Sequence, residues 1–441
     1  MKLAWFTPLP PAQTEIGNVS ARLLPQLSEA FDLTVFTETT DYDRTLRRYA
    51  PIIPFSCDHL DWKQVHRAGH PVYHIGNNYH FHCEIIRTAL LNPGIVVLHD
   101  LSINETLLNI ALHRGGGQTE YFSILQRYGG EEAVTLAKDV IDKDPSHKHT
   151  LVTRFPLFEH VARHATGIIS HNPANIETIR AGSVAPIQYA PLPLLPKCEL
   201  APPIDRSSRQ PPYSILLFGF LGSDNRRLIP FLEALSESGV KESFRVIVAG
   251  KYDKELIKNA AKSLGLKDRL VLRGFVSDDE LDKLLEAADL VPNLRWPSRG
   301  ESSATQLRIW NFSLPSLVTQ TAYYATLPEN AVAFVRPENE KADIIAHLRA
   351  FAADPLPWFR KGLAGRCLLA QSHSSEGFIQ NLKTFLPVAE AFAGKVFPLL
   401  WSRNIAQRHL ASYPAPLARS ALLKRCASEV SSWISPDSTG A

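Results

Sequence analysis

The chain has 441 residues, of which 45% are hydrophobic and 21% charged, with a formal net charge of +3. This length favours two globular domains, and so small a net charge gives no reason to expect nucleic-acid binding. The five cysteines are scattered and form no CxxC pair, so we expect neither a disulfide framework nor a zinc site.

Export and membrane insertion are not expected either. Prolines at positions 8, 10 and 11 break the apolar start at Lys2–Phe6, which is too short for a signal peptide. No segment approaches the ~18 apolar residues of a spanning helix. We expect a cytoplasmic protein. Its basic tail after about Lys395, with an amphipathic piece around Leu422 and Trp433, either contacts the inner face of a membrane or packs across the two domains.

Short apolar runs alternate with helix-period segments, a pattern typical of parallel α/β architecture. In the first half, the expected strands are Leu3–Thr7, Leu33–Thr37, Val72–Ile75, Ile95–His99 and Gly167–Ser170. Residues 102–163 are expected to form a mostly helical insertion before the last of these strands. The first domain would then comprise residues 1–196.

The pattern restarts after a polar, Pro-bearing stretch at residues 197–212, which predicts an interdomain linker. A second domain is expected over residues 213–373, followed by helices and a tail at 374–441 that pack back towards the N-terminal domain. Ser277–Glu280 is a capping box that opens a helix. The expected strands are Ser214–Phe218, Arg245–Ala249, Leu270–Leu272, Leu290–Asn293, Ser316–Thr319 and Val332–Val335. Two Rossmann-like, doubly wound domains facing a cleft are therefore predicted, with ligands at the carboxyl ends of the strands.

The turn Pro297–Thr305 places a carboxylate, Glu301, between an expected strand and an expected helix. Ser302, Ser303 and Thr305 are residue types that cap helix N-termini. The N–H groups and the positive dipole end of a helix start suit a phosphate, and a nearby carboxylate can accept hydrogen bonds from sugar hydroxyls. The turn therefore predicts a site for the sugar and diphosphate of a nucleotide sugar.

The first loop of the second half supplies cations for the same ligand. Gly219 and Gly222 allow a tight turn, and Arg226 and Arg227 follow at an expected helix start. The planar fork of arginine suits phosphate, although a solvated basic turn is the alternative. Lys251, at the end of the next strand, is either a further phosphate cation or an exposed lysine. No GxGxxG fingerprint is present.

These segments resemble retaining glycosyltransferases of the GT-B fold, glycosyltransferase family 4 (group 1), over most of residues 1–395. The resemblance is closest to a bacterial branch with a GESSG…LLRAL donor turn and a Gly-Trp-x-x-Glu-Leu-Pro segment. It implies that Glu301 contacts donor-sugar hydroxyls and that Arg226 and Arg227 neutralise the diphosphate. The matching residues are Gly300-Glu301-Ser302-Ser303-Ala304-Thr305-Gln306-Leu307-Arg308 and Ala322–Asn330.

The sequence departs from the family pattern at several positions. Ile309 stands where most members carry a second Glu, which the compared branch also lacks. Phe220 replaces the usual Arg of the phosphate loop, Ala304 and Ser313 replace glycines, and Thr326 replaces the Glu of the Glu-Leu-Pro triplet. These changes leave the expected fold intact and the donor's identity open.

Loops at strand ends of the first half resemble the family's acceptor side. The loop after the first strand resembles a PLPPxxSGIA segment, so Thr14, Glu15, Ile16 and Gly17 are acceptor-side candidates. Glu15 replaces a glycine there, and a carboxylate repels a diphosphate unless it points away or binds an acceptor hydroxyl. A plain strand-to-helix loop is the alternative.

Two further strand ends carry candidate residues. The resemblance implies that His99 touches the donor sugar near the reaction centre, a structural histidine being the alternative. Asp100 is expected to orient local backbone. Asn77 and His80 belong to a loop that resembles the branch's GN-rich loop, and they are acceptor-side candidates.

Three short clusters contain residue types that can bind a metal ion. The ligands needed to complete a tetrahedral set are missing around His80-Phe81-His82-Cys83 and around His160 and His164. Asp41-Tyr42-Asp43 resembles the DxD of metal-dependent glycosyltransferases, but it lies in a polar loop and is interpreted as chance. We expect neither a metal nor another cofactor.

The sequence predicts a retaining hexosyltransferase that moves a hexose-like sugar from a nucleotide-diphosphate sugar to the hydroxyl of a carbohydrate, lipid-linked or protein acceptor. The catalytic candidates are His99, Glu301 and Arg226, and no protein nucleophile is evident. A noncatalytic GT-B binding protein, favoured by the departures from the family pattern, and a GT-B epimerase or phosphorylase remain alternatives. The donor-binding candidates are Gly219, Arg226, Arg227, Lys251, Glu301, Ser302, Ser303, Ala304 and Thr305.

Overall fold

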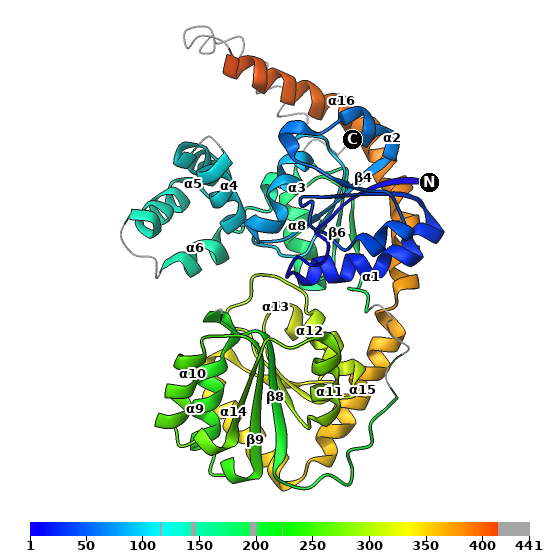
Figure 1. Ribbon diagram of the computed structural model, residues 1–441. Coiled ribbons are helices and arrows are strands. Elements are labelled where there is room, and N and C mark those ends of the chain that lie inside the picture. The colour runs from blue at the N-terminus through cyan, green and yellow to red at the C-terminus, as the bar shows by residue number, and fades with distance from the viewer. Residues whose placement is uncertain (115–116, 143–146, 195–199, 201, 223, 413–441) are drawn as a thin grey trace. The chain divides into compact units, whose positions relative to one another are not determined.

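The computed structural model describes residues 1–114, 117–142, 147–194, 200, 202–222 and 224–412. The chain divides into two compact units, one made of residues 1–190 with the described part of 378–441, the other of residues 191–377. Each unit is a parallel β-sheet with helices on both faces (Figure 1). The expected α/β class is confirmed.

In the described part of the first unit, seven parallel strands are ordered β3-β2-β1-β4-β5-β6-β7. The chain changes its direction of progress across the sheet between β1 and β4, a topological switch point. The strands β3 and β7 were not expected, because three-residue edge strands are too short to show a period. The strands are β1 (Lys2–Phe6), β2 (Asp32–Thr37), β3 (Ile52–Pro54), β4 (His70–Ile75), β5 (Ile95–Leu98), β6 (Gly167–Ser170) and β7 (Ile187–Tyr189).

The helices of the first unit cover both faces of its sheet, and the insertion is helical as expected, forming α4 to α7. Phe6, Tyr73 and Leu98 belong to a core that also includes residues of α2, α3 and α8. The helix α16 packs against β6, where a Cβ added to Gly167 would lie 2.8 Å from the Phe385 ring. The helices are α1 (Glu15–Ala30), α2 (Trp62–Ala68), α3 (Tyr79–Leu91), α4 (Asn104–Arg114), α5 (Gly117–Asp142), α6 (Lys148–Arg154), α7 (Glu159–Ala162), α8 (Ile176–Gly182) and α16 (Ser375–Ser412).

The second unit has two three-stranded segments, β10-β9-β8 and β11-β12-β13. A parallel bridge between Ile215 and Leu290 joins them, so the combined order is that of a Rossmann sheet with its switch point between β8 and β11. Every strand expected in this half is present. The strands are β8 (Tyr213–Phe220), β9 (Phe244–Lys251), β10 (Leu270–Gly274), β11 (Val291–Asn293), β12 (Ser316–Thr319) and β13 (Ala333–Val335).

Figure 1 shows α9, α10 and α14 on one side of this sheet and α11, α12 and α15 on the other. As expected, Ser277 caps α11, because its hydroxyl accepts the N–H of Glu280 at 3.2 Å. The helices are α9 (Leu228–Glu237), α10 (Lys254–Ser263), α11 (Asp278–Ala287), α12 (Ala304–Asn311), α13 (Ala322–Ala325), α14 (Glu340–Ala353) and α15 (Leu356–Ser372).

The segment expected to be a linker is attached to the second unit in its described part. Arg206 is buried, and its guanidinium donates to the carbonyl oxygens of Ala288 at 2.9 Å and Phe312 at 3.0 Å. These carbonyls follow the ends of α11 and α12, where a cation is favourable. Polar, Pro-rich composition alone did not reveal this anchor. The division between the units falls after Ala190 rather than after residue 196.

The tail expected to be amphipathic, around Leu422 and Trp433, lies outside the described residues. Among the helices that the structure describes, none combines the length and the apolar character that crossing a membrane requires. In the polar loop after β2, Asp43 caps a short 3-10 turn by accepting the Thr45 N–H at 2.9 Å. That contact gives the second Asp of the DxD-like triplet a local structural role.

Candidate functional site

Two loops of the second unit are joined at the switch point between β8 and β11. One follows β8 and contains the 3-10 turn η5 (Asp224–Arg226), and the other connects β11 to α12. The Trp296 N–H donates to the Asn225 carbonyl at 2.8 Å, and the Asn225 side chain donates to the Pro297 carbonyl at 3.4 Å. The loops that carry Arg226 and Glu301 are thus held together by one backbone hydrogen bond and by the Asn225 side chain.

Glu301 is 9% exposed and lies within a set of hydrogen-bond donors. Arg295 Nη1 donates to Oε1 at 3.0 Å, and Oε2 accepts the Arg299 N–H at 2.7 Å and the Ser298 hydroxyl at 3.2 Å. Burial alone would raise the pKa of Glu301, but the Arg295 charge, the hydrogen bond from Arg295 and the backbone N–H of Arg299 together lower the pKa below its ordinary value. Glu301 is therefore a charged acceptor at neutral pH.

Arg295 also belongs to this site, although it was not predicted from the sequence. Burial and then the charge of Arg295 lower the pKa of the half-buried Arg226 to about 9, so Arg226 stays charged at neutral pH. Glu301 opposes that lowering. Two positive charges thus act on one negative charge, and the cluster is suited to an anion. The sequence feature that could have identified Arg295 is its place shortly after a strand and six residues before Glu301.

The helix α12 begins where the sequence predicted, with Ser303 as its N-cap. The Ser303 hydroxyl accepts the Gln306 N–H at 3.1 Å. Beneath the turn, the Asn293 side chain donates to Gln306 Oε1 at 3.0 Å, and Gln306 Nε2 donates to the Ser316 hydroxyl at 2.8 Å. These side chains are buried, so the network fixes the position of the helix start.

The backbone N–H groups at the start of α12 are the predicted diphosphate ligands. Ser302 precedes the cap, and Ala304 and Thr305 form the first turn. The first N–H groups of a helix have no acceptor within the helix, and they carry its positive dipole end. They follow Glu301 on the same turn, and their binding of the diphosphate stays a prediction.

The two arginines predicted to act as a pair have different partners. Arg227 adopts a left-handed backbone with φ of 52° at the N-cap of α9. Its guanidinium is bound by the carboxylate of Glu340 on α14, with Nε 2.8 Å from Oε1 and Nη2 also donating to Oε2. Arg227 is therefore charge-compensated within the unit, and Arg226 and Arg295 are the arginines that act together on Glu301.

The ends of β8 and β9 approach each other through glycines. Gly250 has a φ of 129°, and a Cβ added there would lie 2.0 Å from the Gly219 carbonyl oxygen. Gly219 itself has a φ of 104°. Lys251 has an exposed side chain, and its carbonyl accepts N–H groups from Leu221 at 2.8 Å and Gly222 at 3.1 Å. The main chain of Lys251 thus shapes the loop, and its side-chain role remains a prediction.

In the first unit, the candidate loops after β1, β4 and β5 meet. The Asn77 N–H donates to Asp100 Oδ2 at 2.7 Å, which confirms that Asp100 orients local backbone. A Cβ added to Gly76 would lie 2.8 Å from Ile16 Cδ1 and 3.2 Å from Asp100 Oδ2. The loops are therefore packed against each other at the switch point of this sheet.

The remaining acceptor-side candidates lie at the start of α1. Thr14 is the N-cap but makes no capping hydrogen bond with its side chain. Glu15 is exposed, and its carboxylate accepts the Asn18 side chain at 3.4 Å. Gly17 is buried, and a Cβ there would lie 3.3 Å from the Pro8 carbonyl oxygen. The Glu15 carboxylate is thus accessible to solvent rather than held inside the loop.

His99 belongs to a histidine cluster at the carboxyl ends of β4, β5 and β6. Its Nε2 lies 2.9 Å from His74 Nδ1, and its ring centroid is 5.1 Å from that of His171. Burial, followed by the neighbouring charges of His171, His74 and His82, holds the pKa of His99 well below its ordinary value. His99 is therefore a neutral hydrogen-bonding group at neutral pH. His74 and His171 were not predicted from the sequence, although both lie at strand ends.

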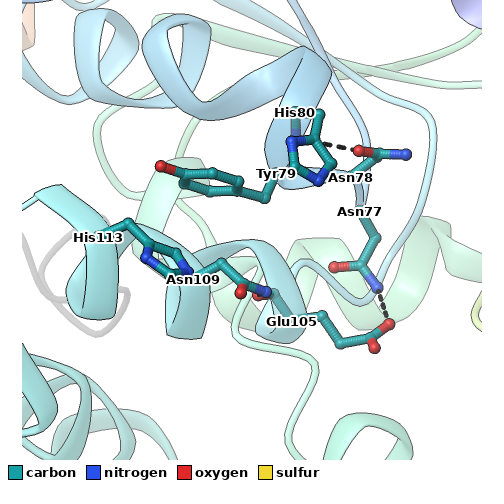
Figure 2. A pocket seen from close by; sticks show the side chains of 7 residues that line it. All are labelled: Asn77, Asn78, Tyr79, His80, Glu105, Asn109 and His113. Atoms are coloured by element: carbon teal, nitrogen blue, oxygen red, sulfur yellow. Dashed lines mark hydrogen bonds between the residues drawn. The ribbon is translucent and has the colours of Figure 1, made fainter.

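Asn77 and His80 are brought together as lining residues of one pocket between the start of α3 and α4 (Figure 2). These two residues were predicted from the sequence, but their partners on α4 were not. The sequence feature that could have identified these partners is the four-residue spacing of Glu105, Asn109 and His113 in α4.

Comparisons with known proteins identify the fold by structural similarity and not by sequence. No protein-family model and no curated protein sequence matches the chain. WaaG, a glycosyltransferase involved in lipopolysaccharide biosynthesis, has a TM-score of 0.56 at 14% identity, covering 86% of this chain and 98% of its own. The sucrose-phosphate synthase of Thermosynechococcus elongatus has a TM-score of 0.59 at 14% identity, covering 89% and 99%.

A third similar structure is Anabaena HepE in complex with UDP-glucose, with a TM-score of 0.53 at 12% identity. It covers 88% of this chain and 100% of its own. Likeness at these identities shows the fold alone. The chain has the GT-B fold of these proteins, as the sequence predicted.

Proposed function

We propose that the protein is a GT-B glycosyltransferase that moves a sugar from a nucleotide-diphosphate sugar to an acceptor hydroxyl. The observation that carries the proposal is the cluster at the β8–β11 switch point, where a buried charged carboxylate, two arginines and a helix start occur together. The HepE structures in complex with UDP or UDP-glucose support the same class of donor for this chain.

Glu301 holds the donor sugar in this proposal. A carboxylate oxygen accepts about two hydrogen bonds, and Oε1 has Arg295 as its side-chain donor, which leaves capacity for a sugar hydroxyl. Because Glu301 is already held by Ser298 and Arg299, it is pre-organised and loses little freedom on binding. Its lowered pKa suits an acceptor of hydrogen bonds rather than a general acid.

The leaving diphosphate is stabilised by charge. Arg226 and the N–H groups of Ala304 and Thr305 provide positive charge where negative charge grows during transfer, which is electrostatic catalysis. These groups supply the charge for which other glycosyltransferases use a metal, so we propose metal-independent transfer. The retained anomeric configuration and the hexose-like sugar rest on the resemblance of the 300–308 turn to family 4 enzymes.

His99 contributes a neutral imidazole. With Nε2 engaged by His74, the ring offers Nδ1 to a sugar hydroxyl. No side chain is proposed as nucleophile, and the leaving phosphate takes the proton of the acceptor hydroxyl. The acceptor-side candidates Asn77 and His80 are not assigned to the donor, so variants at these two positions test the transfer step separately from donor binding.

The experiment is a calorimetric titration of the wild type with UDP-, GDP-, ADP- and dTDP-sugars, repeated with Arg226→Ala and Glu301→Gln. We expect one donor class to bind, and each variant to bind it about tenfold to one-hundredfold more weakly, the value of a charge-assisted hydrogen bond. The control is Lys258→Ala, which removes an exposed ion pair with Glu255 on α10. If no donor binds, or if the variants bind as well as the control, the site assignment is wrong.

Transfer itself is tested by following the donor that binds with candidate acceptors and determining the anomeric configuration of the product by NMR. Clean donor binding without transfer or donor hydrolysis would instead favour a noncatalytic sugar-nucleotide-binding protein. The exposed Glu15 and the 42% exposed Phe220, at positions where the family has glycine and arginine, are the observations that favour that alternative.

A further inference from the structure

A pocket of about 260 Å³ opens between the start of α3 and one face of α4 in the first unit. Asn77 lines it from the turn that leads into α3, and Tyr79 and His80 line it from the first turn of α3. Figure 2 shows the side chains of α4 arranged across the pocket from Tyr79 and His80. The pocket is therefore built where the helical insertion meets the switch-point loop of the sheet.

The contribution of α4 follows from helical spacing. Glu105, Asn109 and His113 are each four residues apart, so they lie on one face of the helix. Asn109 Nδ2 donates to the Glu105 carbonyl at 2.7 Å, and Asn77 Nδ2 donates to Glu105 Oε2 at 3.1 Å. The amide and carboxylate groups at the base of the pocket are thus held in defined orientations.

Asn77 ties the pocket to the rest of the unit. Its Oδ1 accepts the Thr106 N–H at 3.2 Å and the Thr106 hydroxyl at 3.3 Å. Its own N–H donates to Asp100 at 2.7 Å. With both ends of the side chain and the backbone engaged, Asn77 is a fixed element that does not need ordering when a ligand binds.

An aromatic wall stands beside this polar base. Tyr79 is half-buried, and its ring centroid lies 5.4 Å from that of His113 and 5.5 Å from that of His80. The rings of Tyr79 and His113 are inclined at 49°, so they form a tilted surface rather than a closed stack. A flat ligand with one apolar face can lie against such rings.

The charges of the pocket favour a neutral ligand. Neither Lys nor Arg is among its lining residues, and its one carboxylate, Glu105, is paired with Lys148 at 2.5 Å. The lining therefore offers no lysine or arginine to bind a phosphate. No group of three metal-ligating side chains occurs in the described part of the chain, so a metal ion does not explain this polar set.

We propose that this pocket binds one neutral sugar ring of the acceptor, which makes the acceptor a saccharide. The inference rests on the proposed function for its assignment to the acceptor. A pyranose has an apolar C–H face that suits Tyr79 and His113, and an edge of hydroxyls that matches amide and carboxylate groups. Sites for drug-sized ligands measure about 300–1,000 Å³, so a slightly smaller pocket suits a single ring.

The test is saturation-transfer NMR of the full chain with methyl glycosides of glucose, galactose, mannose and N-acetylglucosamine, with uridine as a stacking control. We expect at least one glycoside to bind the wild type in the millimolar range. We expect Tyr79→Ala and His113→Ala to weaken it about tenfold, and Tyr79→Phe to retain it because the ring remains. The matched control is Leu112→Ala, an exposed residue beside His113 on α4 that does not line the pocket.

Because His113 is exposed, its variant decides the result if Tyr79→Ala fails to fold. Absence of glycoside binding, equal binding by His113→Ala and Leu112→Ala, or preference for uridine in this pocket overturns the proposal. In a transfer assay, the acceptor KM should rise in Tyr79→Ala while the donor KM stays unchanged. Glycoside binding by a wild type that binds no nucleotide sugar would refute the proposed function and leave the sugar pocket standing.

Discussion

Removing Arg295 should destabilise the second unit by more than the loss of a surface ion pair. The Arg295 and Glu301 side chains are only 12% and 11% exposed, and Nη1 lies 3.0 Å from Oε1. Arg295→Ala leaves the Glu301 carboxylate buried with the Ser298 hydroxyl and the Arg299 N–H as its donors. Breaking a buried pair costs about 3–5 kcal/mol, and we expect about 3 because two donors remain.

For a unit of this size, 1 kcal/mol corresponds to about 2–4 °C in Tm, so we expect a fall of about 6–12 °C. The pKa of Glu301 is lowered in the folded state, so its contribution to stability is present above the unfolded pKa and is lost as pH falls through the folded value. The difference between Arg295→Ala and the wild type should therefore shrink in acid.

The assay is differential scanning calorimetry of the wild type, Arg295→Ala, Glu301→Gln and the double variant, which form a double-mutant cycle. Lys258→Ala serves as the control, since its partner Glu255 and Lys258 itself are exposed. Exposed pairs contribute about 0.2–1 kcal/mol. If Arg295→Ala lowers Tm no more than Lys258→Ala, or if the cycle gives no coupling, the buried pair does not hold the donor turn.

Three further predictions concern protonation and backbone shape. Burial raises the pKa of Glu38 to about 8, so the folded state keeps a proton that the unfolded chain loses, and stability falls as pH rises from about 4.5 to 8. Glu38→Gln should flatten that slope in urea unfolding, and an unchanged slope would contradict the burial argument. The pH dependence that His99 contributes to stability runs in the opposite direction. Because the pKa of His99 is lowered in the folded state, stability falls as pH drops below about 6.5. His99→Gln should reduce this acid sensitivity in the same titration, and equal sensitivity would count against it. Gly250→Ala should destabilise the second unit by about 3 kcal/mol, since its Cβ would lie 2.0 Å from the Gly219 carbonyl, whereas Gly239→Ala, with open space around it, should cost about 1 kcal/mol of backbone strain. Similar Tm values for these two glycine variants would show that the strand ends can separate.

Much of the fold could be predicted from the chain because the governing interactions are local. Strand and helix periods gave the α/β alternation in both halves, and the caps of α11 and α12 depend on Ser277 and Ser303, each bonding a residue three positions ahead. The placement of Glu301 before a helix start is likewise readable from the turn itself. The strands β3 and β7 were not predicted, because edge strands of three residues are too short to show a hydrophobic period.

The sequence by itself determined the types of element and the residue types offered at each strand end. Only the tertiary structure decided which of them meet, because strand order and register bring together residues far apart in the chain. Thus Arg227 is bound by Glu340, 113 positions away, and Arg226 acts with Arg295 instead. His74 and His99 share a hydrogen bond only because β4 and β5 are neighbours. Hydrophobic periodicity encodes which face of an element is buried, but not its neighbour.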